Sequence, residues 1–138
     1  MKRWLIFLIV FVLFGPMFSG AQEIKDGYGK MTLPDGSVYE GEFSKGKFDG
    51  KGQLDYADQR QYIGEFKNGL YDGKGVLLYT DGSKYEGQFK KGLLNGRGVL
   101  TYVDGGSYKG QFKDGEISGQ GAVTNFDGTA IINSSDNK

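Results

Sequence analysis

From residue 26 to residue 130, apolar side chains and glycines alternate along the chain with positions that are mostly polar. In one stretch Tyr85, Gly87 and Phe89 have one parity, whereas Glu86 and Gln88 have the other. A period of two is that of a β-strand with one buried face. No helical period appears after residue 21, so the pattern predicts half-buried antiparallel strands.

The alternation recurs every 23 residues without insertions, and each unit contains two strands. The first strand reads Tyr-x-Gly-x-Phe, and its aromatic columns are Tyr39, Tyr62, Tyr85 and Tyr108, then Phe43, Phe66, Phe89 and Phe112. The second strand reads Gly-x-Gly-x-hydrophobic. We expect a repeat domain over 22–130, with half a unit at 26–38, full units at 39–61, 62–84, 85–107 and 108–130, and a polar tail at 131–138.

Parity limits how the strands pair, because a loop of the wrong length turns every side chain to the other face. Between units we expect a three-residue loop, Asp81-Gly82-Ser83, which suits a glycine with positive φ. The predicted pairs are Tyr79 with Tyr85, Leu77 with Gly87, Gly75 with Phe89, Tyr62 with Leu77 and Phe66 with Gly73. In this register glycines make room for the phenylalanine rings.

The expected fold is all-β: an elongated, single-layer, antiparallel meander of repeated hairpins, similar to a solenoid. A lone hairpin is marginal in water, so its stability depends on the neighbouring units. One face of the sheet is aromatic and the other is polar. The aromatic face has to be covered by curling of the sheet into a trough, by a second copy, or by a partner.

Composition excludes several classes of function. The chain has no His and no Cys, which removes the usual general base, the thiol nucleophile and zinc or iron–sulfur thiolate sites. Lys and Arg number 17 and balance 17 Asp and Glu, which argues against nucleic acid as the main partner. We expect no enzymatic activity, no cofactor and no metal.

The N-terminal segment 1–21 has the three parts of a secretory signal. Lys2 and Arg3 precede an apolar run over 4–14, and Ser19-Gly20-Ala21 offers a cleavage site before Gln22. Eleven apolar residues are too few for a bilayer core of roughly 30 Å. We therefore expect export to the periplasm or outside the cell by a cleaved signal peptide. The alternative is an uncleaved segment that anchors the chain to the membrane.

Two acidic columns and one column on the polar face are candidate sites. Each unit has an Asp-Gly turn, except that the first full unit has Gln59 instead of glycine; the aspartates are Asp35, Asp58, Asp81, Asp104 and Asp127. Their spacing lacks the dense oxygen ligands of calcium, which favours a structural turn. The second column, Asp49, Asp72 and Asn95, has the same interpretation. Glu42, Glu65, Gln88 and Gln111 align on the polar face, where the pattern favours a solvated surface over catalysis.

The pattern Tyr62-Ile63-Gly64-Glu65-Phe66-Lys67-Asn68-Gly69, followed by Gly73-Lys74-Gly75, resembles the MORN repeat (membrane occupation and recognition nexus). The resemblance covers residues 26–130. It implies a binding module for phospholipids or a protein scaffold, without choosing between them.

We expect an exported, non-catalytic scaffold that binds a protein or peptide through its aromatic face. The proposed contacts are Tyr39, Phe43, Tyr62, Phe66, Tyr85, Phe89, Tyr108 and Phe112, which can also belong to the core alone, and a homodimer through this face is a further option. The alternative is a peripheral module for anionic phospholipid, using a basic edge made of Lys45, Lys67, Lys90, Lys91 and Lys113.

Overall fold

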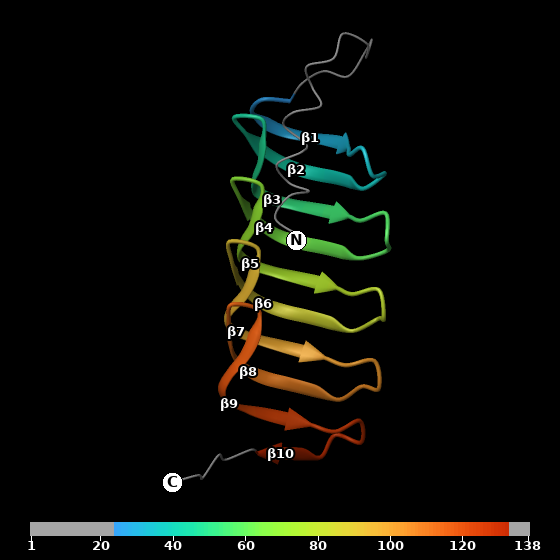
Figure 1. Ribbon diagram of the computed structural model, residues 1–138, viewed down its shortest axis with the longest axis vertical. Coiled ribbons are helices and arrows are strands. Elements are labelled where there is room, and N and C mark those ends of the chain that lie inside the picture. The colour runs from blue at the N-terminus through green and yellow to red at the C-terminus, as the bar shows by residue number, and fades with distance from the viewer. Residues whose placement is uncertain (1–23, 133–138) are drawn as a thin grey trace.

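The computed structural model describes residues 24–132, and the predicted signal segment lies outside them. Ten strands follow one another in a single antiparallel sheet in the order of the sequence (Figure 1). They are β1 (Gly27–Thr32), β2 (Val38–Ser44), β3 (Lys47–Asp55), β4 (Gln61–Lys67), β5 (Leu70–Leu78), β6 (Lys84–Lys90), β7 (Leu93–Thr101), β8 (Ser107–Lys113), β9 (Glu116–Thr124) and β10 (Ala130–Ile132). The predicted all-β hairpin meander is confirmed, with β1 and β10 at opposite ends of the ribbon.

The sheet extends beyond the predicted start of the polar tail. Ile131 pairs with Val123 in the same way that Tyr108 pairs with Leu100, so β10 keeps the phase of the repeat as far as Ile132. The interpretation of 131–138 as tail was therefore wrong for its first two residues, which continue the ladder although an isoleucine replaces the tyrosine.

The loops between units have the predicted parity but a different register. Leu77 pairs with Tyr85 and Gly75 with Gly87, so the predicted Leu77–Gly87, Tyr79–Tyr85 and Gly75–Phe89 pairs are wrong by two residues. The Tyr79 N–H donates to the Ser83 carbonyl (2.9 Å) and the Gly82 N–H donates to the Tyr79 carbonyl (3.0 Å). The tight loop is thus Thr80-Asp81-Gly82, which closes with Gly82 at a φ of 88°.

Within each unit, two residues form the turn, as at Asn68-Gly69 between β4 and β5. Both have positive φ, 50° and 81°, as a type I′ turn requires. The predicted Tyr62–Leu77 pair is confirmed. The predicted Phe66–Gly73 pair is wrong, because the register shifts after Gly64 and Phe66 faces Tyr71.

That shift is a bulge at the first glycine of each second strand, where Gly50, Gly73, Gly96 and Gly119 have φ between 77° and 103°. A bulge bends its strand and increases the local twist. The left-hand ends of the hairpins accordingly turn out of the plane of the rest of the sheet (Figure 1). Within residues 24–132, twelve hydrophobic side chains are buried, and the bend allows a single layer to enclose them. Curling of the sheet therefore covers the tyrosine and phenylalanine columns of the aromatic face.

The glycines of the sheet lie beneath tyrosine rings rather than phenylalanine rings. A Cβ added to Gly75 would lie 2.6 Å from Cζ of Tyr62, and one added to Gly64 would lie 2.5 Å from Cα of Gly75. Phe66 and Phe89 stand edge-on to the Tyr62 ring, with centroids 5.0 and 5.1 Å away. Each phenylalanine was predicted to lie between glycines of both neighbouring strands. The prediction was wrong for one of these strands, because its bulge places an apolar residue opposite the phenylalanine.

Gln59 occupies the loop position that is glycine in the other units and has a φ of 74°. A left-handed conformation costs a residue with a Cβ roughly 1–2 kcal/mol. We predict that Gln59→Gly raises the free energy of unfolding by about 1 kcal/mol, measured as a higher urea midpoint by circular dichroism. Gly82→Gln at the equivalent position should lower it by a similar amount. A lower midpoint for Gln59→Gly would show that the Gln59 side chain stabilises the loop.

Candidate functional site

The eight aromatic residues predicted to bind a partner all lie in the core, with exposed fractions of 0 to 5%. The rings of Tyr39, Tyr62 and Tyr85 each pack against the phenylalanine of their own strand and that of the next tyrosine-bearing strand, as Tyr39 does with Phe43 and Phe66 (5.1 Å in both cases). The structure thus brings these residues together, but as packing partners. A ligand on this face would reach the side chains around them.

The core tyrosines hold their hydroxyls in hydrogen bonds to the backbone. The Tyr62 hydroxyl donates to the Glu65 carbonyl (2.8 Å), and that of Tyr85 donates to the Gln88 carbonyl (2.9 Å). Burial raises the pKa of both groups above the usual range of tyrosine. A neutral phenol inside the sheet therefore satisfies its one polar atom and has a structural role.

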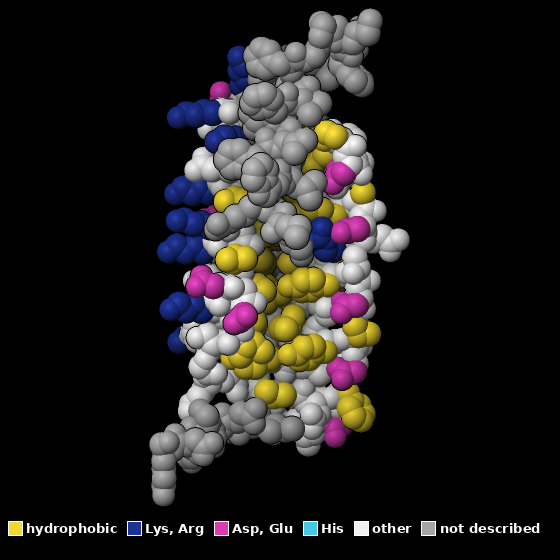
Figure 2. Space-filling view, in the orientation of Figure 1, with side chains coloured by type: hydrophobic (Ala, Val, Ile, Leu, Met, Phe, Trp, Pro, Cys, Tyr) yellow, Lys and Arg dark blue, Asp and Glu magenta, His cyan; other side chains and the backbone are white. Residues whose placement is uncertain are grey.

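A stripe of partly exposed hydrophobic side chains lies on the aromatic face, over the core. We call it the aromatic stripe: Tyr56, Tyr71, Tyr79, Leu94, Leu100, Tyr102 and Ile117. Figure 2 shows hydrophobic side chains gathered along the middle of this face. Tyr102 and Ile117 are the most open members, 42% and 49% exposed. The sequence showed these columns, but it did not show that they, rather than the Tyr-x-Gly-x-Phe columns, reach the surface.

The N-terminal half of the stripe carries polar groups among its rings. The hydroxyls of Tyr56 and Tyr71 are hydrogen-bonded to each other, and Tyr71 stacks on Tyr62 with centroids 3.7 Å apart. The Arg60 guanidinium lies 4.3 Å from the centroid of the Tyr56 ring and donates to Asp58 (2.8 Å). Phenol hydroxyls and a guanidinium beside apolar rings are the groups enriched in protein interfaces.

The five predicted lipid-binding lysines are all exposed and lie at or beside the two-residue turns. We call this row the lysine edge: Lys45, Lys67, Lys90, Lys91 and Lys113. Figure 2 shows basic side chains along this edge and acidic side chains along the opposite edge, where the Asp-Gly loops lie. Leu93, 42% exposed, follows the Lys91-Gly92 turn. The ribbon is thus polarised across its width.

The first acidic column is confirmed as turn chemistry. Asp81 accepts a hydrogen bond from the Ser83 N–H (2.8 Å), and Asp35 and Asp104 accept the equivalent bonds. The hydrogen bond from the Ser83 hydroxyl (2.6 Å), and after it that from the Ser83 N–H, lowers the pKa of Asp81 below its ordinary value. Within residues 24–132, no group of three or more acidic side chains is arranged to hold a metal ion.

The second acidic column joins neighbouring units. Asp49 accepts a hydrogen bond from the Asn68 N–H (3.2 Å) and Asp72 one from the Lys91 N–H (3.3 Å), so each carboxylate holds the two-residue turn of the next unit. From the sequence, these residues were interpreted as turn residues of their own unit. No pattern in the sequence indicates a hydrogen bond between residues that are 19 positions apart.

The side chains of Glu42, Glu65 and Gln88 accept hydrogen bonds at the bulges. They accept the N–H groups of Lys51 (2.6 Å), Lys74 (3.2 Å) and Arg97 (2.9 Å). The bulge turns these donors away from the ladder. A carboxylate oxygen and an amide oxygen can both accept this hydrogen bond, which explains why both Glu and Gln occur in this column. The expectation of a merely solvated column missed this role.

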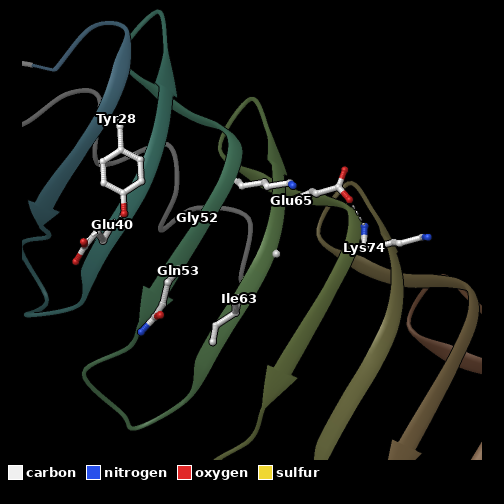
Figure 3. Close-up of a pocket in the computed structure, with 9 residues that line it drawn as sticks. Tyr28, Glu40, Gly52, Gln53, Ile63, Glu65 and Lys74 are labelled. Atoms are coloured by element: carbon white, nitrogen blue, oxygen red, sulfur yellow. Dashed lines mark hydrogen bonds between the residues drawn. The ribbon is translucent and has the colours of Figure 1, made fainter.

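A shallow hollow on the polar face lies over β1–β5 and is lined by Tyr28, Ile63 and Lys74 among others (Figure 3). The Tyr28 hydroxyl donates to Glu40 (3.2 Å), and Glu40 also pairs with Lys30 (3.3 Å). The Tyr28 ring is 70% exposed, so the hollow does not exclude water. This setting lacks the enclosed environment that acid–base catalysis uses to change a carboxyl pKa.

Fold and surfaces together define a β-hairpin repeat protein whose units stack into one continuous ribbon. The sequence model described as MORN repeat matches residues 24–38, 39–59, 62–84, 85–107 and 108–129. These segments cover more than half of the chain, which therefore belongs to the MORN repeat family. No curated protein matches it.

Repeats of this family are a non-catalytic type and are generally associated with scaffolds that bind proteins or membranes. The part of the chain that the structure describes contains no helix with the length and apolarity of a membrane span.

Proposed function

We propose that this protein is a non-catalytic scaffold that binds a protein or peptide along the aromatic stripe. The observation that carries the proposal is the partial exposure of the stripe residues above a fully packed core. Rings already fixed by packing lose little conformational entropy when a partner covers them. The eight aromatic residues that the sequence predicted as contacts lie beneath the stripe, and their packing holds its side chains in place.

The character of the stripe favours a polypeptide over a small molecule. It runs along several units as an open surface, whereas small ligands prefer enclosed concave pockets. Tyrosine hydroxyls and Arg60 supply polar contacts beside apolar rings, as protein interfaces do. A second copy of the chain is one such partner, which would give a homodimer through this face.

The lysine edge supports a different candidate function, peripheral binding to anionic phospholipid. Its five lysines are exposed on one edge, and each lysine near an anionic surface contributes roughly 1 kcal/mol. Exposed Leu93 among them offers an apolar contact. Asp49 and Asp72 reduce the positive charge of this edge, so we place lipid second.

We predict that Tyr79→Ser/Tyr102→Ser abolishes capture of a specific protein from the native envelope, because it removes two rings of the stripe. Ile63→Ser is the matched control, since Ile63 is 46% exposed on the polar face. The measurement is affinity capture on immobilised protein, with circular dichroism to verify the fold of each variant. Light scattering on the free protein detects the homodimer.

Liposome flotation with the same proteins separates the lipid alternative. If the protein binds a membrane instead of a protein partner, its binding to anionic vesicles should fall steeply with salt. The double variant Lys45→Asn/Lys91→Asn should also weaken that binding. Asparagine suits this test because Asn68-Gly69 already forms the same turn in the chain.

In the affinity-capture experiment, equal capture by the Tyr79→Ser/Tyr102→Ser variant and the wild type would refute the proposed site.

We also propose export, with cleavage before Gln22, on the strength of the charged, apolar and small-residue parts of segment 1–21. N-terminal sequencing of protein from the native envelope should begin at Gln22. A chain that retains Met1 and stays with the membrane would indicate the anchored alternative, and one that retains Met1 in the cytoplasm would refute both.

A further inference from the structure

Three tyrosines of the aromatic stripe form a row along the length of the ribbon. Tyr56, Tyr79 and Tyr102 occupy the same position in successive units, 23 residues apart, and each directly follows the second strand of its unit. Their N–H groups close the loops in the same way, by hydrogen bonds of 2.8 to 2.9 Å to the carbonyl four residues later. We call these three residues the tyrosine row.

The pitch of the tyrosine row distinguishes between polypeptide conformations. Successive members are two strands apart, and since neighbouring strands lie about 4.8 Å apart, the pitch is about 9.6 Å. A β-strand presents side chains on one face about every 6.7 Å, and two turns of α-helix advance about 10.8 Å. A polyproline II helix advances about 9.3 Å in one turn of three residues. Of these three conformations, the polyproline II helix best keeps one residue per turn in step with the row.

The second and third members of the tyrosine row have unused hydrogen-bond donors. The Tyr56 hydroxyl is hydrogen-bonded to that of Tyr71. In the next two units a leucine and an isoleucine replace Tyr71, so this bond cannot form. Within residues 24–132, the hydroxyls of Tyr79 and Tyr102 accordingly have no hydrogen bond. A polyproline II helix has no internal hydrogen bonds, so its carbonyl groups can accept from both phenols.

Acidic groups accompany the same two tyrosines. Asp81 and Asp104 each follow a tyrosine of the row by two residues and are exposed, on the edge that is acidic in Figure 2. Burial, and after it the charge of Asp81, raises the pKa of the Tyr79 hydroxyl, so the carboxylate lies within electrostatic reach of the phenol. The aspartates have the same pitch as the tyrosines. A basic side chain once per turn of a bound helix would therefore complement their charge.

We propose that the partner of the aromatic stripe is a proline-rich segment in the polyproline II conformation, with Lys or Arg at every third position. It lies along the tyrosine row, with its prolines on the rings of Tyr79 and Tyr102 and its basic side chains toward Asp81 and Asp104. A helix that is already formed loses little entropy on binding, which favours such ligands for open aromatic surfaces. This inference rests on the proposed function, because it names the chemical class of the partner.

A synthetic peptide of four Pro-Pro-Lys triplets is the probe. We expect it to bind the protein, measured by fluorescence anisotropy, and to shift the amide NMR signals of Tyr79 and Tyr102 but not that of Ile63 on the polar face. A peptide of Pro-Pro-Glu triplets reverses the charge and should not bind. A peptide of Pro-Pro-Pro-Lys repeats keeps the helix but places its lysines out of step with the aspartates, so it should bind severalfold more weakly.

A variant without the two free hydroxyls tests the tyrosine contacts. Tyr79→Phe/Tyr102→Phe keeps both rings and removes two hydrogen-bond donors, so the Pro-Pro-Lys peptide should bind about fivefold more weakly or worse. Tyr79→Ser/Tyr102→Ser, which also removes the rings, should abolish binding. Circular dichroism verifies that both variants keep the fold.

A second pair of variants tests the charges. Asp81→Asn/Asp104→Asn keeps an oxygen acceptor for each loop but removes both carboxylates, so peptide binding should weaken and lose most of its dependence on salt. Asp49→Asn/Asp72→Asn is the matched control, because it makes the same change in net charge at the lysine edge, where Asn95 already occupies the equivalent position. This control should bind the peptide as the wild type does.

The inference would be overturned by a Pro-Pro-Lys peptide that does not bind, or that binds the Tyr79→Phe/Tyr102→Phe or the Asp81→Asn/Asp104→Asn variant as well as the wild type. Equal affinity for the Pro-Pro-Pro-Lys peptide would also overturn it. The affinity capture described above tests the proposed function separately. If capture depends on Tyr79 and Tyr102 although the peptide does not bind, the stripe binds a polypeptide of another kind, and this inference alone fails.

Discussion

The fold depends on one arrangement, a tyrosine ring lying flat on two facing glycines with its hydroxyl bonded to a backbone carbonyl. Gly64 and Gly75 are paired, and neither has room for a Cβ beneath Tyr62. Glycine in a strand costs propensity and unfolded-state entropy. Burial of a large ring offsets that cost, and the same arrangement repeats in every unit. Phenylalanines wedged between successive tyrosines then couple each unit to the next.

This arrangement decides which aromatic residues are available for function. The core uses the tyrosines and phenylalanines of the first strand in each unit, and bulges at positive-φ glycines bend the sheet around them. The side chains that remain at the surface include the aromatic stripe and the lysine edge. Binding on any of these surfaces leaves the packed floor unchanged, as expected of a rigid scaffold.

The sequence predicted the repeat, the number of strands per unit and the face of each side chain, because these follow from the 23-residue and two-residue periods. It did not predict the bulge, because the sequence does not distinguish a glycine that adopts a positive φ, such as Gly73, from a glycine that lies beneath a ring. The error of two residues at the Asp81-Gly82 loop has a similar origin, because loops of the same parity keep the pattern of faces. Burial of Tyr39 and Phe66 depends on the bend, so the sequence could not separate core from contact surface.

Comparison of Gly75→Ala with Gly82→Ala by urea unfolding tests the central arrangement most directly. Gly82 has a positive φ and open space, so alanine there adds only backbone strain, about 1 kcal/mol. At Gly75 a methyl group would lie 2.5 to 2.7 Å from atoms of the Tyr62 phenol, and the ring would have to leave its place. We predict a loss of about 3 kcal/mol or more, as for removal of a large core side chain. A Gly75→Ala variant as stable as Gly82→Ala would contradict the account.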